Sequence, residues 1–237
     1  MSLALLSMDG LLFLLRWIHF FAGVTWIGLL YYFNFVQVPY FAETKTGAGT
    51  GEFRKLIYRA LFWFRWAAMF TFLSGLTILI LTGVQGGAGV YSQSWGISIL
   101  TGGLFGTIML ANVWRVIWPK QQVVLKSVEA VAGGGQADPA AGPAGARAFL
   151  ASRTNTLLSI PMLFFMGAAR HLPILDEGQN GWIAFGIVAA IAAAVEANVF
   201  LGKKGEGPSK LLESHTNVIY AGVALALVCY LIIELVG

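Results

Sequence analysis

Residues 11–36 read LLFLLRWIHFFAGVTWIGLLYYFNFV, an apolar run longer than a membrane-spanning helix requires. A helix needs about 20 mostly apolar residues to cross roughly 30 Å of hydrocarbon. Arg16 and His19 are the ionisable side chains within this run. The residues before it lack the basic segment of a cleavable signal peptide. We therefore expect the run to remain as a helix of the mature protein.

The whole chain shares this apolar character. Of its 237 residues, 57% are hydrophobic and 11% are charged, and the mean hydropathy is +0.74. An ordinary soluble domain has about 25% charged residues, so this composition excludes a soluble globule. It predicts an all-α, polytopic integral membrane protein, a single membrane domain with six transmembrane helices. The predicted helices cover residues 11–36, 60–83, 95–118, 154–172, 182–201 and 216–236.

The basic residues of the predicted loops lie on one side of the membrane. Residues 37–59, 119–153 and 202–215 contain eleven Lys and Arg, whereas residues 84–94 and 173–181 contain none. Basic residues of short loops stay in the cytoplasm, so both chain termini are predicted to be exterior, or periplasmic. The net charge of +4 therefore reflects topology, and we expect no nucleic-acid partner. A tract rich in Gly, Ala and Pro predicts a flexible cytoplasmic linker over residues 119–150.

Ionisable residues inside a bilayer are costly, so each of them indicates a partner or a function. His19 lies about 12 Å below the outer boundary, with Arg16 one turn nearer the surface on the same helical face. A b-type haem takes an imidazole on its iron and guanidinium groups on its propionates. His171, beside Arg170, ends the fourth predicted helix on the same outer side, whereas His215 lies at the opposite face. His19 and His171 are therefore the predicted pair of iron ligands.

These polar residues also have simpler interpretations. His19 can hydrogen bond to a backbone carbonyl or to a polar neighbour such as Asn112. Glu196 can pass protons, but pairing with an arginine of the second or third predicted helix is the favoured interpretation. The segment RTNTLLSIP at residues 153–161 can bind a small polar ligand, although a helix cap is favoured.

Three stretches together resemble a known family. They read RWIHFFAGVTWIGLLYYFNFVQ at residues 16–37, ANVWRVIWPKQQ at 111–122 and SRTNTLLSIPMLFFMGAARHLP at 152–173. They are similar to the transmembrane N-terminal domain of bacterial membrane-bound urate oxidases of the PuuD type. The resemblance implies urate oxidation by a multi-helix membrane domain, with a c-type cytochrome domain receiving the electrons. The residues to which it points are His19, Asn112, Trp114, Pro119, Gln121, Asn155, Pro161 and His171.

The chain departs from this family pattern at two points. It has no Cys-x-x-Cys-His run, so we expect the cytochrome domain to be absent and electrons to leave through a partner. Thr154 stands where the family motif is expected to have a histidine, which puts urate chemistry in question. The first predicted helix is also similar to HemJ-type protoporphyrinogen oxidases and CopD-like proteins, and this similarity implies haem.

These observations predict a membrane redox protein that binds haem b in the bacterial cytoplasmic membrane, with urate oxidase-like activity as the enzymatic hypothesis. Its expected partners are the lipid bilayer and either other membrane subunits or a separate cytochrome c. The predicted haem contacts are His19, His171, Arg16 and Arg170, and the candidate catalytic residues are Asn112, Asn155 and Glu196. Two alternatives stay open: a non-catalytic transmembrane subunit of a larger respiratory or photosynthetic complex, and a small transporter.

Overall fold

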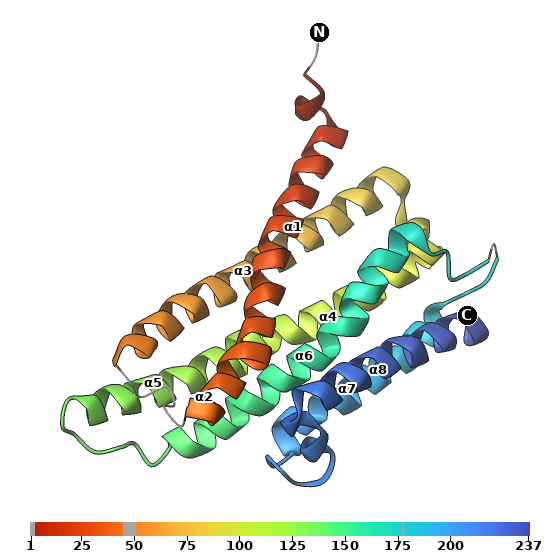
Figure 1. Cartoon of the computed structure of the whole chain (residues 1–237). Coiled ribbons are helices and arrows are strands. Elements are labelled where there is room, and N and C mark those ends of the chain that lie inside the picture. Colours follow the sequence, from red (N-terminus) through yellow and green to blue (C-terminus); the bar gives the residue numbers. More distant parts are fainter. Residues whose placement is uncertain (1–2, 45–50, 177) are drawn as a thin grey trace.

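The computed structural model describes residues 3–44, 51–176 and 178–237, and every regular element in these ranges is helical. The predicted all-α class is therefore confirmed. Long helices lie side by side in a bundle (Figure 1). In chain order the elements are η1 (Ala4–Leu6), α1 (Met8–Tyr31), η2 (Tyr32–Gln37), α2 (Val38–Thr44), α3 (Gly51–Gly86), η4 (Ala88–Ser92), α4 (Ser94–Asn112), η5 (Val113–Ile117), α5 (Trp118–Ala132), α6 (Ala141–His171), α7 (Trp182–Leu201), η6 (Gly207–Glu213) and α8 (His215–Val236).

Two of the short elements, η2 and η5, are π-helical turns inside longer helices. η2 ends at Gln37, two residues before Pro39, and η5 ends at Ile117, two residues before Pro119. Proline has no N–H to donate, and its ring clashes with a carbonyl of the preceding helical turn. A π-helical turn is wider and so makes room for the proline ring. Thus α1, η2 and α2 form one continuous helix with a widened turn, as do α4, η5 and α5.

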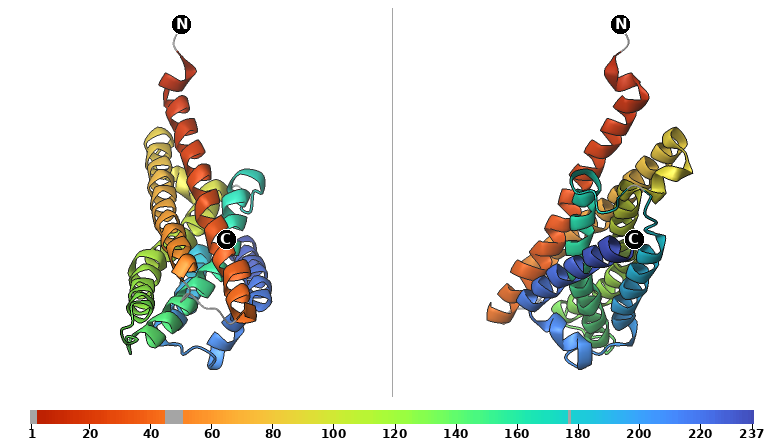
Figure 2. Two further views of the ribbon diagram at one scale, coloured as in Figure 1. Left: turned by 60° about the vertical axis from the view of Figure 1, so that its left-hand side comes forward. Right: turned by 90° about the vertical axis from the view of Figure 1, so that its right-hand side faces the viewer.

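The helix α6 forms the centre of the bundle. It packs against α4, α5, α7 and α8, and about half of its residues are buried. Large buried side chains around it include Phe105 of α4, Phe165 of α6 itself and Ile233 of α8. By contrast, α1 pairs mainly with α3, and its N-terminal part stands away from the other helices (Figure 2).

Five helices in the described ranges are long and apolar enough to cross a membrane, so the chain is a multi-pass membrane protein. They are Met8–Thr44, Arg54–Gly86, Ser94–Ala132, Trp182–Leu201 and His215–Val236. The central helix α6 is not among them, although its 31 residues would extend about 46 Å. Its sequence is more polar than those of the five apolar helices. A polar helix can occupy this central position because it packs against protein rather than lipid. The six-helix count therefore stays a prediction.

The basic loops gather at one end of the bundle. The α5–α6 connection, the α7–α8 connection and the start of α3 lie at the lower end in Figure 1. The start of α1 and the α3–α4 and α6–α7 connections, whose sequences contain no Lys or Arg, lie toward the other end. The fold thus segregates the charges as the sequence predicted, while the side of the membrane that each end faces stays a prediction.

The linker predicted over residues 119–150 is much shorter than expected. Helix α5 extends to Ala132 and α6 begins at Ala141, so residues 133–140 alone connect them. Leu125 and Leu150 are 0% and 1% exposed, which places both flanks of this connection in the core. The abundance of alanine and glycine made the segment look unable to pack, but small residues also allow helices to approach closely.

Candidate functional site

His19 projects from α1 toward α3, where two polar groups hold its imidazole. Its Nδ1 lies 2.8 Å from the backbone carbonyl oxygen of Thr71 and 3.3 Å from Ser74 Oγ. A carbonyl oxygen can only accept, so Nδ1 donates, and Nε2 of the neutral ring keeps its lone pair. Of the simpler interpretations of His19, the bond to a backbone carbonyl is confirmed, whereas Asn112 is engaged elsewhere.

Gly75 allows the imidazole to lie against the backbone of α3. A Cβ atom at this position would be 2.9 Å from His19 Cε1, closer than side chains approach one another. The ring is half-buried and rests on this glycine. One helix therefore fixes the orientation of His19 through a carbonyl, a hydroxyl and a close backbone contact.

The other predicted haem contacts, Arg16, Arg170 and His171, are all exposed. Arg16 lies one turn before His19 on α1, and Arg170 and His171 belong to the last turn of α6. In the described part of the chain, the hydrogen bonds of His19 go to α3 and not to these residues. Their joint role with His19 stays a prediction. His215 begins α8 at the end with the basic loops, and its ring centre is 6.2 Å from that of Phe35.

A second polar group, the amide cluster, consists of Asn112 from α4, Asn155 from α6 and Glu196 from α7. Asn112 Nδ2 donates to Asn155 Oδ1 and to Glu196 Oε2, both at 2.9 Å. Asn155 Nδ2 donates in turn to the backbone oxygen of Met109 at 2.9 Å. Asn112 and Asn155 are 1% and 0% exposed. The structure thus joins the three candidate catalytic residues in one network, and their catalytic role stays a prediction.

The N-terminal helix also sends polar side chains to α6. Asn34 Nδ2 donates to Ser152 Oγ at 2.8 Å and to the backbone oxygen of Leu30 at 2.9 Å. The hydroxyls of Tyr31 and Ser159 lie 2.9 Å apart. Polar contacts from α1, η2 and α4 therefore converge on the central helix, and Glu196 of α7 joins them through Asn112.

Both π-helical turns border these contacts. Asn34 lies inside η2, and Asn112 directly precedes η5. Each asparagine is 1% exposed, and each donates to a side chain of α6. Widened turns of this kind are frequent at functional sites. Their position here marks the core around α6 as the second candidate site.

Arg153 of α6 is 2% exposed, which is rare for an arginine. Its Nε and Nη1 atoms are buried and have no hydrogen-bond partner. Its guanidinium carbon lies 5.2 Å from the centre of the Phe149 ring, and Lys204 Nζ lies 4.4 Å from the same centre. In the described ranges, Lys203 and Glu206 form the ion pair whose nitrogen and oxygen lie within 4.0 Å of each other. Arg153 therefore has no carboxylate partner among the described residues.

The predicted pairing of Glu196 with an arginine is wrong. Glu196 accepts a hydrogen bond from Asn112, and Arg65 instead lies among aromatic rings of α3, η5 and α5. The Arg65 guanidinium carbon is 3.8 Å from the ring centre of Trp118 and 5.0 Å from that of Trp114. Aromatic faces attract a cation without carrying a charge. A search for partners among ionisable residues alone therefore does not find these rings.

The predicted helix cap at residues 153–161 is also wrong. Helix α6 begins at Ala141, so these hydroxyls and amides lie in the interior of a helix, where Pro161 is also accommodated. Thr154, Thr156 and Ser159 are at most 1% exposed. The segment is therefore a polar stripe in the protein core, not the solvated start of a helix.

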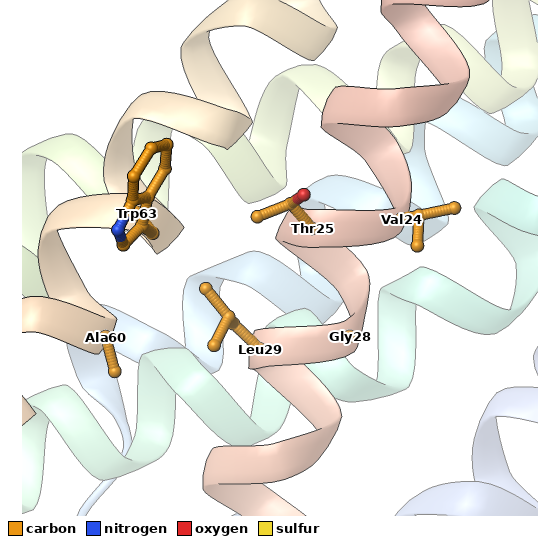
Figure 3. Close-up of a pocket in the computed structure, with 6 residues that line it drawn as sticks. All are labelled: Val24, Thr25, Gly28, Leu29, Ala60 and Trp63. Carbon is orange, nitrogen blue, oxygen red and sulfur yellow. The ribbon is translucent and has the colours of Figure 1, made fainter. Parts of the chain in front are cut away.

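Two surface hollows lie outside both polar groups. The first, between α1 and α3, has a volume of about 350 Å³ and is lined by Val24, Thr25, Gly28, Leu29, Ala60 and Trp63 (Figure 3). The second has a volume of about 490 Å³ and is lined by Leu76, Leu79, Ile80, Ala88, Tyr91, Leu100 and Trp182. Their mostly apolar linings suit lipid chains rather than a polar reactant.

Several residues of the second site were not predicted as site residues from the sequence. They are Tyr31, Asn34 and Ser152, whereas Arg153 and Ser159 belong to the segment 153–161, for which binding of a small polar ligand is the alternative interpretation. Arg153 was counted as a loop cation, because its segment resembles a helix start. A usable signal was present in the dense run of polar residues inside an otherwise apolar stretch at 152–159. Such a run in a membrane helix indicates that it faces protein rather than lipid.

Comparison with known proteins connects the second site to a family. The family model described as urate oxidase N-terminal matches residues 88–232, more than half of the chain. The matched segment contains the amide cluster and Arg153, whereas α1 and α3 precede it. No curated protein and no solved structure matches the chain. The similarity of the first helix to HemJ-type and CopD-like proteins stays a prediction.

Proposed function

Because the chain belongs to the urate oxidase N-terminal family, we propose that it is a membrane redox protein that holds a b-type haem on His19. In this proposal the electron donor is urate or a related purine, and the electrons leave to a separate carrier such as a cytochrome c. The membrane is the bacterial cytoplasmic membrane. When bound, a b-type haem supplies one-electron redox chemistry.

The observation that carries the proposal is the orientation of His19. Ligating histidines almost always donate their second ring nitrogen to a carboxylate, a backbone carbonyl or water, which fixes the tautomer and the ring plane. The Nδ1 of His19 makes this bond to the Thr71 carbonyl at 2.8 Å, so Nε2 is the nitrogen left for a metal. The residues present therefore fit one axial ligand of a haem.

The remaining contacts of the proposed site come from the outer end of the bundle. Arg16 and Arg170 are exposed cations that can pair with propionates, since guanidinium groups bind carboxylates in a bidentate manner. His171 would supply the second imidazole that holds the haem iron. It is exposed at the last turn of α6, so tilting of α1 toward that end would be needed for it to share an iron with His19.

We also propose that α6 crosses the membrane as a sixth span and that the basic end of the bundle faces the cytoplasm. The gathering of the basic loops at one end supports this orientation. A reporter fused after Gly237 should then behave as exterior, and one inserted within residues 133–140 as cytoplasmic. A cytoplasmic result for the C-terminal fusion would contradict the six-span topology.

The haem proposal is tested by visible spectroscopy of the full chain, purified from cells with ample haem. The wild-type protein should show a Soret band and sharp reduced α and β bands. His19→Ala should lose them, while His171→Ala should retain less haem or give a high-spin spectrum, because an open position on the iron replaces one imidazole.

His215→Ala is the matched control, because this residue lies at the end with the basic loops. It should keep the wild-type spectrum. A wild-type protein without haem, or a His19→Ala variant that keeps the wild-type spectrum at equal yield, would overturn the proposal.

A further inference from the structure

We propose that the bundle contains an anion-binding site built on Arg153, whose ligand presents oxygen acceptors to the buried guanidinium. The proposal does not depend on haem at His19. It starts from an imbalance of charge: Arg153 is 2% exposed, and neither Nε nor Nη1 has a partner. Arginine remains protonated in proteins, so the core holds an uncompensated cation.

Burying such a cation without a counter-charge is strongly unfavourable. Among the residues that the structure describes, its close contact with an aromatic ring is with Phe149, at 5.2 Å from the ring centre, and this is only partial compensation. Arg65, whose Nε is also buried without a hydrogen-bond partner, provides a comparison within the same chain, because three tryptophan rings surround it, the nearest at 3.8 Å. Arg153 lacks such a cage, and a bound anion would complete its surroundings.

A second cation lies close to Arg153. Lys204 Nζ lies 4.4 Å from the centre of the Phe149 ring, so two cations share this ring. Lys204 itself is exposed and follows the end of α7, near Arg147, which donates to the backbone oxygens of Val199 and Gly202. Lys204 and Arg147 therefore lie near the buried guanidinium, on a connection that also carries the carboxylates of Glu206 and Glu213.

Two buried threonines lie close to Arg153 along α6. Thr154 and Thr156 are each at most 1% exposed, and Thr156 Oγ1 donates to the backbone oxygen of Ser152 at 3.0 Å. The guanidinium offers donors in a planar fork that matches pairs of oxygen acceptors. Two sources share this chemistry: the phosphate of an anionic lipid headgroup and a small soluble oxygen-bearing anion. Both are tested below.

The experiment measures thermal unfolding of the full chain in nanodiscs of phosphatidylcholine. One arm adds phosphatidylglycerol to the bilayer, and the other adds inorganic phosphate or urate at constant ionic strength. The Tm of the wild-type protein should rise in at least one arm. For a soluble anion above its Kd the rise should be roughly 3–6 °C for each tenfold increase in concentration.

Arg153→Met should abolish this rise, because it removes the guanidinium and keeps a long side chain. Its Tm without added anion should be equal to or above that of the wild type, because the unpaired charge is gone. Arg115→Met, which removes an exposed arginine, should keep the full rise. Should Arg153→Met fail to fold, Arg153→Lys retains the charge but not the planar fork, and its rise should be smaller.

A rise with phosphatidylglycerol alone would identify a lipid headgroup as the ligand, and a rise with phosphate or urate would identify a soluble anion. The inference is overturned if the wild-type Tm does not rise in either arm, or if the rise is unchanged in the Arg153 variants. A missing haem spectrum would leave this result untouched, so the two proposals fail separately.

Discussion

The two candidate sites differ in how the bundle surrounds them. His19 lies at the α1–α3 pair, half-buried, and a single helix supplies its partners Thr71 and Ser74. The amide cluster lies in the centre, where Asn112, Asn155 and Glu196 come from three different helices. The first arrangement depends on the geometry of one helix pair. The second depends on the assembly of the whole bundle.

A shared local motif makes this contrast sharper. Both α3 and α6 contain a threonine followed three residues later by a serine, whose hydroxyl donates to the threonine carbonyl. The distances are 3.0 Å for Ser74 to Thr71 and 2.7 Å for Ser159 to Thr156. On α3 the threonine carbonyl accepts a hydrogen bond from His19, and on α6 the serine hydroxyl contacts the hydroxyl of Tyr31. Helix α1 therefore places a histidine at the threonine–serine pair of α3 and a tyrosine at that of α6. Of these two side chains, only the histidine can ligate a metal through nitrogen.

The largest expected effect concerns the glycine beneath His19. Gly75→Ala places a Cβ 2.9 Å from His19 Cε1, so the imidazole must move and its bond to Thr71 must weaken. Changes in the groups that orient a ligating histidine typically reduce metal affinity about 10- to 100-fold. Haem affinity measured by titration of the apoprotein should fall by that factor.

Gly23→Ala is the matched control for this variant. Its Cβ would lie 3.8 Å from Thr71 Cγ2, an ordinary contact at the same helix pair. Its haem affinity should equal that of the wild type. Equal losses in both variants would mean that α1–α3 packing in general, rather than the orientation of His19, controls the site.

An intermediate effect is expected at the amide cluster. Asn155→Leu leaves Asn112 Nδ2 with one acceptor instead of two, in a position that is 1% exposed. Unsatisfied buried groups cost about 1–3 kcal/mol in soluble proteins, and hydrogen bonds between membrane helices are worth about 0.6 kcal/mol on average. We expect unfolding in mild detergent to show a loss of about 1–2 kcal/mol.

Thr107→Val provides the comparison, because Thr107 is exposed on α4 and its hydroxyl donates only to the Gly103 carbonyl. Its change in unfolding free energy should stay within about 0.5 kcal/mol. Haem binding should be unchanged in both variants. A loss of haem with Asn155→Leu would mean that the two sites are coupled through α6, which carries both Asn155 and His171.

The fold was largely predictable because hydropathy and charge report directly on the surrounding solvent. The apolar stretches became helices, and the basic loops lie together at one end. The prediction was least accurate at residues 119–150, where the tract rich in alanine and glycine covers only residues 133–146 and helices α5 and α6 occupy most of the segment. Composition cannot distinguish a segment that packs through small residues from one that does not pack at all.

The sites were predictable only where residue type alone carries information. His19 stands out because histidines are rare in this chain, and Asn112 and Asn155 stand out through a family resemblance. The partners of each residue depend on which helices meet and at what depth. That is why Glu196 was assigned to an arginine, and why Arg153 was placed in a loop although it is 2% exposed in the core.

The smallest effect is expected for Glu196→Gln. The glutamine carbonyl can still accept from Asn112 Nδ2, which lies 2.9 Å from Glu196 Oε2, so the network keeps its hydrogen bond. The change in unfolding free energy should stay within about 0.5 kcal/mol, whereas breaking a buried ion pair would cost about 3–5 kcal/mol. Glu196→Leu, which removes the acceptor, should cost about 0.6–1.7 kcal/mol. Thermal unfolding of both variants decides between a hydrogen-bond acceptor and a charge partner. A loss of several kcal/mol with glutamine would show that an arginine reaches Glu196 in the membrane and that the amide cluster is held by charge.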